Sequence, residues 1–116
     1  MTKKYGVVSI PGALTPTEIL EAYEYGGDII KVFPTTTMGP SYIKDLQGPL
    51  PHIPLLPTGG VDLNNVADFI KAGAVGVGLG SALVNTKVET SDEYHDELEK
   101  TAQAFYNKVH LEKGRA

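Results

Sequence analysis

Short apolar runs alternate with longer amphipathic stretches along the chain. The apolar runs are rich in β-branched and aromatic residues and predict four strands, at Tyr5–Ile10, Asp28–Phe33, Ile53–Leu56 and Ala74–Leu79. The remaining stretches have helical spacing and predict helices over Thr15–Tyr25, Pro40–Gln47, Leu63–Ala72 and about Ser91–Leu111. Strands that alternate with helices indicate βαβ units around a parallel sheet, which is an α/β fold.

The first helix carries clear boundary signals. Thr15 stands at the N-cap position, Pro16 at the first helical position, and Glu18 is placed to close a capping box. Gly26 then ends the helical pattern. The capping box gives Glu18 a structural reason to be present, and we weight it above a role for Glu18 as a general base.

The layout repeats at a shift of 47 residues. This shift places Gly12 on Gly59, the cap Thr15 on a cap at Asp62, the helix stop Gly26 on Gly73, and strand 28–33 on strand 75–80. Repeated βα units favour half of a (β/α)8 barrel, and an open doubly wound sheet is the competing architecture. We expect one domain over 1–116, with a disordered N-terminus at 1–4, four βα units over 5–84 and a C-terminal helix and tail over 85–116.

A lysine interrupts the second apolar run, "GGDIIKVFP". Side chains alternate along a strand, so Lys31 shares a face with Ile29 and Phe33, and the repeat puts Gly76, Gly78 and Gly80 on the equivalent face of the last strand. An apolar pocket lowers the pKa of an amine toward the neutral, nucleophilic form. The strand pattern therefore fits a Schiff-base lysine, and it fits equally well a lysine that reaches a barrel mouth or pairs with an acid such as Asp28.

Two glycine-rich turns follow the last two predicted strands. They are "LPTGGV" at 56–61 and "GLGSALV" at 78–84. Exposed backbone N–H groups at such turns bind anions, and the loops after the last strands of (β/α) barrels often form a phosphate site. Together the turns favour a phosphate or carboxylate site.

Composition narrows the possible partners. The net charge of −4 and the lack of a basic patch argue against nucleic acid. The chain has no cysteine, and its three histidines lack metal-ligand spacing, so we expect no metal. No apolar run is long enough to span a bilayer and the N-terminus lacks a signal-peptide pattern, which makes a cytoplasmic soluble protein the default expectation.

Four segments in order resemble the second half of the 2-keto-3-deoxy-6-phosphogluconate / 4-hydroxy-2-oxoglutarate aldolases. They are "IPGALTPTEI", "DIIKVFP", "GPSYIKDLQGPLPHIPLLPTGGV" and "AGAVGVGLGSALV". The resemblance runs from about Ile10 to Val84, while the C-terminal helix is similar only in type. It implies strands 5–8 of a (β/α)8 barrel and a class I pyruvate aldolase that needs no metal or organic cofactor.

The resemblance also implies a role for each matching position. Lys31 would form the Schiff base with the C2 carbonyl of the keto acid. The substrate-binding positions would be the pocket wall Phe33, the strand-end residues Pro11 and Gly12, the anion-binding Thr58, Gly59 and Gly60, and the distal phosphate ligands Gly80 and Ser81.

In the family the first half of the barrel supplies the general acid/base glutamate and a substrate-binding arginine. We expect neither in this chain, which begins just before the fifth strand, and we expect self-association to cover the open half-barrel. Two hypotheses therefore stand: a Schiff-base aldolase in truncated form, which binds a keto acid or phosphorylated sugar acid, and a non-catalytic half-barrel for binding or assembly. A phosphate-binding isomerase barrel would explain the glycine turns but not Lys31.

Overall fold

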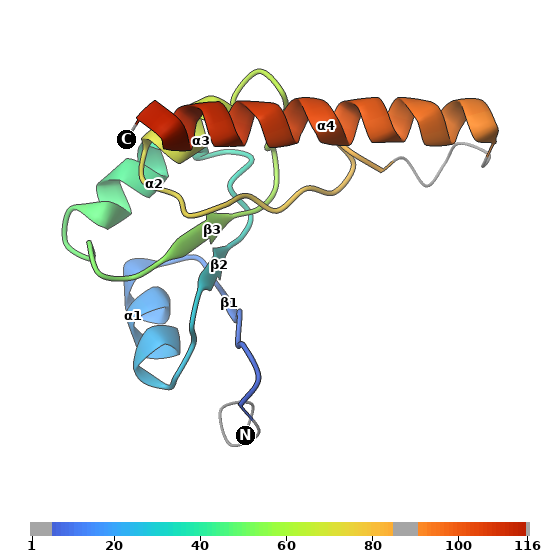
Figure 1. Ribbon diagram of the computed structural model, residues 1–116. Coiled ribbons are helices and arrows are strands. Elements are labelled where there is room, and N and C mark those ends of the chain that lie inside the picture. The colour runs from blue at the N-terminus through green and yellow to red at the C-terminus, as the bar shows by residue number, and fades with distance from the viewer. Residues whose placement is uncertain (1–5, 85–90, 116) are drawn as a thin grey trace.

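A computed structural model of the chain describes residues 6–84 and 91–115. Three short strands form one parallel sheet in the order β1-β2-β3, and Figure 1 shows them at the centre of the fold. In chain order the elements are β1 (Gly12–Ala13), α1 (Pro16–Glu24), β2 (Ile30–Val32), α2 (Gly39–Gln47), β3 (Leu55–Pro57), α3 (Val66–Lys71) and α4 (Asp92–Arg115). The predicted α/β fold with a parallel sheet is confirmed.

Side chains of the central strand β2 point alternately to the two faces of the sheet. Ile30 and Val32 are fully buried, and Lys31 between them is half-buried and points to the opposite face. Leu55 on β3 continues the buried face. The core behind it comes from the three short helices and from α4, with Ile19, Ile43, Leu46, Val66, Phe69 and Phe105 among its members.

The start of α1 is the predicted capping box. Thr15 Oγ1 accepts a hydrogen bond from the backbone N–H of Glu18 at 3.3 Å. The Glu18 carboxylate in turn accepts from the Thr15 backbone N–H at 3.2 Å and from its hydroxyl at 2.8 Å. These bonds satisfy two N–H groups that the helix itself leaves without partners.

Helices α1 and α3 end in the same way, so the 47-residue repeat of the sequence is also present in the structure at these two positions. Gly26 and Gly73 both have positive φ, at 105° and 116°. After α1, Gly27 N–H donates to the Ala22 carbonyl; after α3, Ala74 N–H donates to the Phe69 carbonyl. Both ends are Schellman motifs, in which a residue in the left-handed region turns the chain back toward the sheet.

Neither of the two outer predicted strands forms where the sequence indicates. Tyr5 lies outside the described residues, and 6–10 form no ladder; pairing begins only at Gly12, opposite Lys31. The segment Ala74–Leu79 runs beside β3 with a single bridge, from Thr58 to Gly78. Both predictions of full strands are therefore wrong, since neither segment forms a continuous ladder with its neighbour.

The third predicted helix also begins later than expected. The helix starts at Val66, after Asn65, which makes no side-chain capping bond of its own. Asp62 nevertheless makes the bonds expected of a cap: its carboxylate accepts from the N–H groups of Asn64 and Asn65, at 2.8 and 3.0 Å, and its own N–H donates to Asn65 Oδ1 at 2.8 Å. These reciprocal bonds form a capping box around the turn that leads into the helix, so the predicted cap is confirmed and the predicted start of the helix is not.

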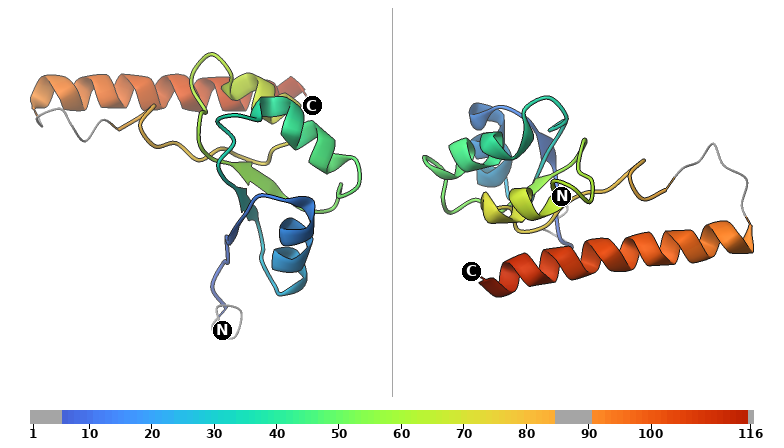
Figure 2. Two further views of the ribbon diagram at one scale, coloured as in Figure 1. Left: turned by 180° about the vertical axis from the view of Figure 1, so that it is seen from behind. Right: turned by 90° about the horizontal axis from the view of Figure 1, so that it is seen from above.

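Helix α4 is longer than predicted and ends at Arg115 rather than Leu111. Its C-terminal part lies along α3, and its N-terminal part extends beyond the rest of the fold (Figures 1 and 2). Lys108 Nζ donates to the Leu63 carbonyl at 2.6 Å, and Lys113 Nζ donates to the Val75 carbonyl. These two bonds hold α4 against the loop before α3 and the segment after α3.

Replacing Thr15 with alanine should destabilise the chain by about 1 kcal/mol, because the first turn of α1 loses its cap. The expected change is a lower midpoint in urea denaturation. Thr17→Ala, an exposed change inside the same helix, is the matched control and should stay within about 0.5 kcal/mol of the parent chain. Equal destabilisation by both variants would contradict the assignment.

The same cap predicts a pH dependence. Bonds from the Thr15 hydroxyl and backbone lower the pKa of Glu18 below its ordinary value of 4.5. A lowered folded-state pKa means that Glu18 contributes stability above pH 4.5, and that this contribution is lost as the pH falls below that value. Thr15→Ala should therefore flatten the acid side of the stability curve, measured by urea denaturation from pH 6 to pH 3.

Candidate active site

Lys31 lies on the open face of the sheet between two small or apolar neighbours. In the ladder it pairs with Gly12 on β1 and Leu56 on β3. Its Nζ lies 4.9 Å from the centroid of the Phe33 ring, a cation–π distance. The glycine that pairs with Lys31 is therefore Gly12. The last segment was predicted to place its glycines near the lysine, but its Gly78 packs against Thr58 instead.

Phe33 connects two hollows at the carboxyl ends of the strands. The lysine hollow, about 460 Å³, is lined by Phe33 with Lys31, Gly12 and Glu18 among others. The glycine hollow, about 450 Å³, is lined by Phe33 on one side and by both glycine-rich turns, including Thr58, Gly59, Gly60, Gly80 and Ser81. Eight of the nine predicted site residues, Phe33 included, therefore line one or both of these hollows, which share the Phe33 ring.

Pro11 is the predicted site residue that lines neither hollow. Its carbonyl accepts the backbone N–H of Lys31 at 2.9 Å, which aligns the segment before β1 with β2. Its ring lies toward Gly27, 2.9 Å from where a Cβ on that glycine would stand. In this structure Pro11 positions the strand rather than the hollow.

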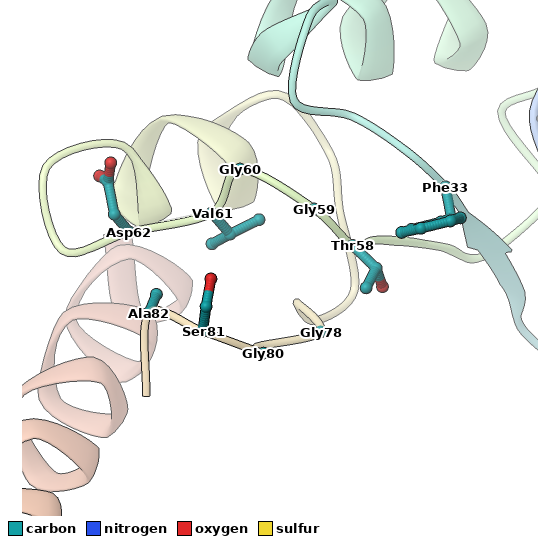
Figure 3. A pocket seen from close by; sticks show the side chains of 10 residues that line it. All are labelled: Phe33, Thr58, Gly59, Gly60, Val61, Asp62, Gly78, Gly80, Ser81 and Ala82. Atoms are coloured by element: carbon teal, nitrogen blue, oxygen red, sulfur yellow. The ribbon is translucent and has the colours of Figure 1, made fainter. Parts of the chain in front are cut away.

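The side chains of the glycine hollow converge from two turns (Figure 3). The Ser81 hydroxyl points toward Val61, across the space between the turns, while the Asp62 carboxylate points away from it. The Thr58 hydroxyl oxygen is shielded from solvent and has no hydrogen-bond partner among the described residues. It packs against Gly78, and a buried hydroxyl without a partner is uncommon in folded proteins.

Gly59 and Gly60 are required by the shape of their turn. Both have positive φ, 96° and 74°, a region that residues with a side chain rarely adopt. A Cβ on Gly60 would stand 2.6 Å from the Thr36 Cα, so the loop after β2 leaves no room for it. The turn therefore packs tightly against residues 35–36.

Glu18 lines the lysine hollow and also serves the capping box. Its carboxylate is held by Thr15, and the bonds from Thr15 lower its pKa. A carboxylate with a lowered pKa is a weaker base than an ordinary one. The geometry thus supports the capping role that the sequence predicts for Glu18, rather than a role as general base.

Three residues of the site region were not predicted from the sequence. Thr35 and Asn65 bond the carbonyls of the Thr58–Gly60 turn. Tyr42 of α2 donates to the Leu14 carbonyl at 2.6 Å, and burial, then the nearby charge of Glu18, raises the pKa of this phenol. Single polar residues that bond distant backbone groups leave no periodic signal in a sequence.

The parts of the chain that the structure describes, 6–84 and 91–115, contain no group of three His, Asp or Glu side chains placed to hold a metal. Within the same ranges no helix is both long and apolar enough to cross a membrane.

Comparison with known proteins identifies the family. Residues 2–100 match the family described as "Aldolase: KDPG and KHG aldolase". The chain therefore belongs to the KDPG and KHG aldolase family, and its resemblance to that family is confirmed.

Curated relatives of the chain have names that fit this family. The chain is 45% identical over 80 residues to the 2-dehydro-3-deoxy-6-phosphogalactonate aldolase of Escherichia coli, covering 68% of this chain and 39% of that protein. It is 44% identical over 62 residues to the 2-dehydro-3-deoxy-phosphogluconate aldolase of Pseudomonas aeruginosa, covering 53% of this chain and 28% of that protein.

A solved structure titled "Native KDPGal structure" superimposes with a TM-score of 0.79 at 34% identity, over 93% of this chain and 52% of that one. The chain thus spans about half the length, or less, of these relatives.

Gly60→Ala should destabilise the chain by about 1–3 kcal/mol, because the new Cβ meets the Thr36 backbone and the residue needs positive φ. Urea denaturation measures the change. Gly114→Ala, within helix α4 and with open space where the Cβ would stand, is the control and should be neutral or slightly stabilising. A neutral Gly60→Ala would show that the turn is built differently.

Proposed function

We propose that this chain carries the Schiff-base half of a class I keto-acid aldolase. The substrate would be 2-keto-3-deoxy-6-phosphogluconate, or a close phosphorylated sugar acid, cleaved to pyruvate and glyceraldehyde 3-phosphate; 4-hydroxy-2-oxoglutarate, cleaved to pyruvate and glyoxylate, is the shorter alternative. One observation carries the proposal: Phe33 contacts both hollows, so that one substrate can reach the amine of Lys31 and the anion-binding turns together.

The proposed chemistry begins with the neutral amine of Lys31. It attacks the C2 carbonyl of the keto acid, and loss of water gives an iminium. The iminium accepts the electron pair of the C3–C4 bond as that bond breaks and the C4 hydroxyl loses its proton, which releases the aldehyde. The resulting enamine takes up a proton at C3, and water hydrolyses the imine to pyruvate and free Lys31.

The two turns provide groups for the acidic ends of such a substrate. Thr58, Gly59 and Gly60 would bind the carboxylate end or the phosphate, and Gly80 with Ser81 would hold the distal phosphate. The Ser81 hydroxyl that points across the glycine hollow, and the place of both turns in its lining, support this assignment. Hydroxyl and backbone N–H donors suit an oxyanion in a space of this size.

Proton transfer requires a group beyond those seen around Lys31. Among the described residues Glu18 is the acid that lines the lysine hollow, and Thr15 already holds its carboxylate. We propose that the general base comes from the other half of the family's barrel, which would cover the open face of the sheet. The half-exposed Lys31 and the exposed Phe33, 52% accessible, support such a cover.

Imine formation can be tested in isolation from turnover. Treatment with pyruvate and borohydride should add the mass of one reduced pyruvate to the chain, located at Lys31 by peptide mass spectrometry. Lys31→Arg should abolish the adduct because a guanidinium forms no imine, while Lys44→Arg on the surface of α2 should retain it. No adduct in the parent chain would favour the alternative, a non-catalytic half-barrel for binding or assembly.

Self-association would also cover the open face of the sheet, although a second copy repeats the same side chains and brings no new kind of acid to Lys31. Two copies would give a two-fold symmetric barrel, and an isolated monomer should be marginally stable and poorly active. Sedimentation equilibrium should show a concentration-dependent dimer. Ile10→Glu, beside Lys31 in the lysine hollow, should weaken it about tenfold or more, and Tyr25→Glu at the end of α1 should not. A cooperatively folded monomer with full aldolase turnover would overturn this proposal.

A further inference from the structure

We propose that Thr35 and Asn65 are positioning residues that set the oxyanion-binding conformation of the turn from Thr58 to Val61. Neither residue belongs to the glycine-rich motifs. Both bond the turn through its carbonyl groups. The inference rests on the proposed function for the nature of the ligand, an oxyanion such as a phosphate or a carboxylate.

Thr35 acts from inside the fold. It is 1% exposed and is the one buried polar side chain among the described residues. Its hydroxyl lies 2.7 Å from the Gly59 carbonyl and 3.1 Å from the Thr58 carbonyl, and its backbone N–H donates to the Thr58 carbonyl at 3.0 Å. A hydroxyl buried at this point requires acceptors, and the turn supplies them.

Asn65 acts from the start of α3. Its Nδ2 donates to the Gly60 carbonyl at 2.8 Å, and its Oδ1 accepts from the Asp62 N–H at 2.8 Å. One amide side chain therefore closes the far end of the turn. With the bonds from Thr35, the carbonyls of Thr58, Gly59 and Gly60 are all engaged.

Fixing a carbonyl also fixes the next N–H. The two groups share a planar peptide unit and point in opposite directions in the trans form. Holding the three carbonyls toward Thr35 and Asn65 therefore directs the N–H groups of the following residues, Gly59, Gly60 and Val61, away from them. Those three N–H groups have no partner among the described residues, and all three residues line the glycine hollow. Successive N–H donors of this kind bind an oxyanion.

The test follows the backbone amides of the 116-residue chain by NMR during titration with inorganic phosphate, and in a second arm with pyruvate. In the parent chain the amides of Gly59, Gly60 and Val61 should shift on binding. Thr35→Val, which removes the hydroxyl but keeps the shape, should weaken binding about tenfold, as expected for loss of one buried hydrogen bond. Thr35→Ser should restore affinity to near the parent value.

Matched controls separate this role from general destabilisation. Thr37→Val makes the same change at an exposed site two residues away and should bind like the parent chain. Asn65→Ala should weaken binding, while Asn64→Ala should not, because the bond that Asn64 makes here comes from its backbone N–H and not from its side chain. If Thr35→Val does not fold, the Asn65 and Asn64 pair decides the question by the same criterion.

The result that would overturn the inference is equal oxyanion affinity in the parent chain, Thr35→Val and Asn65→Ala. The absence of any shift at Gly59, Gly60 and Val61 with both ligands would overturn it too. A response to pyruvate alone, lost in Thr35→Val, supports the inference with a carboxylate as the ligand. Pyruvate trapping at Lys31 is scored separately, so failure of the aldolase proposal and failure of the positioning proposal give different results.

Discussion

The parallel pairing of β2 between β1 and β3 is the constraint on which the rest of the structure depends. This pairing fixes the face that each side chain takes: Ile30 and Val32 enter the core, while Lys31 and, just beyond β2, Phe33 are left on the opposite face. A slip of one residue would exchange the two sets and bury the ammonium group of Lys31 among apolar side chains, which costs several kcal/mol. The apolar core and the candidate site thus support the same register.

The glycine hollow depends on the register in a second way. The Thr58 N–H donates to the Val32 carbonyl just beyond β3, and the loop after β2 then brings Thr35 beneath the turn. The same strand end therefore positions Phe33 and supports the turn from Thr58 to Val61, the candidate anion site. A shift at β2 would move both halves of the candidate site together.

Much of this arrangement is predictable from the sequence, because it depends on local or periodic signals. Strand alternation places Lys31 and Phe33 on one face, and the pattern from Thr15 to Glu18 predicts the capping box. The turn residues Gly59 and Gly60 are predictable because positive φ favours glycine.

The remainder depends on contacts between segments far apart in the chain. Thr35 reads as an ordinary loop residue, and only the fold shows that it lies under a turn more than twenty positions away. The boundary of α3 was misplaced because Asp62 bonds the turn before the helix rather than the helix itself. The outer strands were overestimated because apolar content predicts extended chain but not whether a neighbouring strand pairs with it.

The short strand β1, which lies at one end of the sheet order, has a further consequence for the chain in the cell. Beside it Val7, Val8 and Ile10 are 55%, 65% and 48% exposed. An outer strand flanked by exposed branched apolar residues is a template for additional strands from other chains. Newly made chains that do not find a proper partner surface quickly would compete for this edge with one another. Yield and solubility should therefore depend on the rate of synthesis and on chaperone supply as much as on the stability of the folded state.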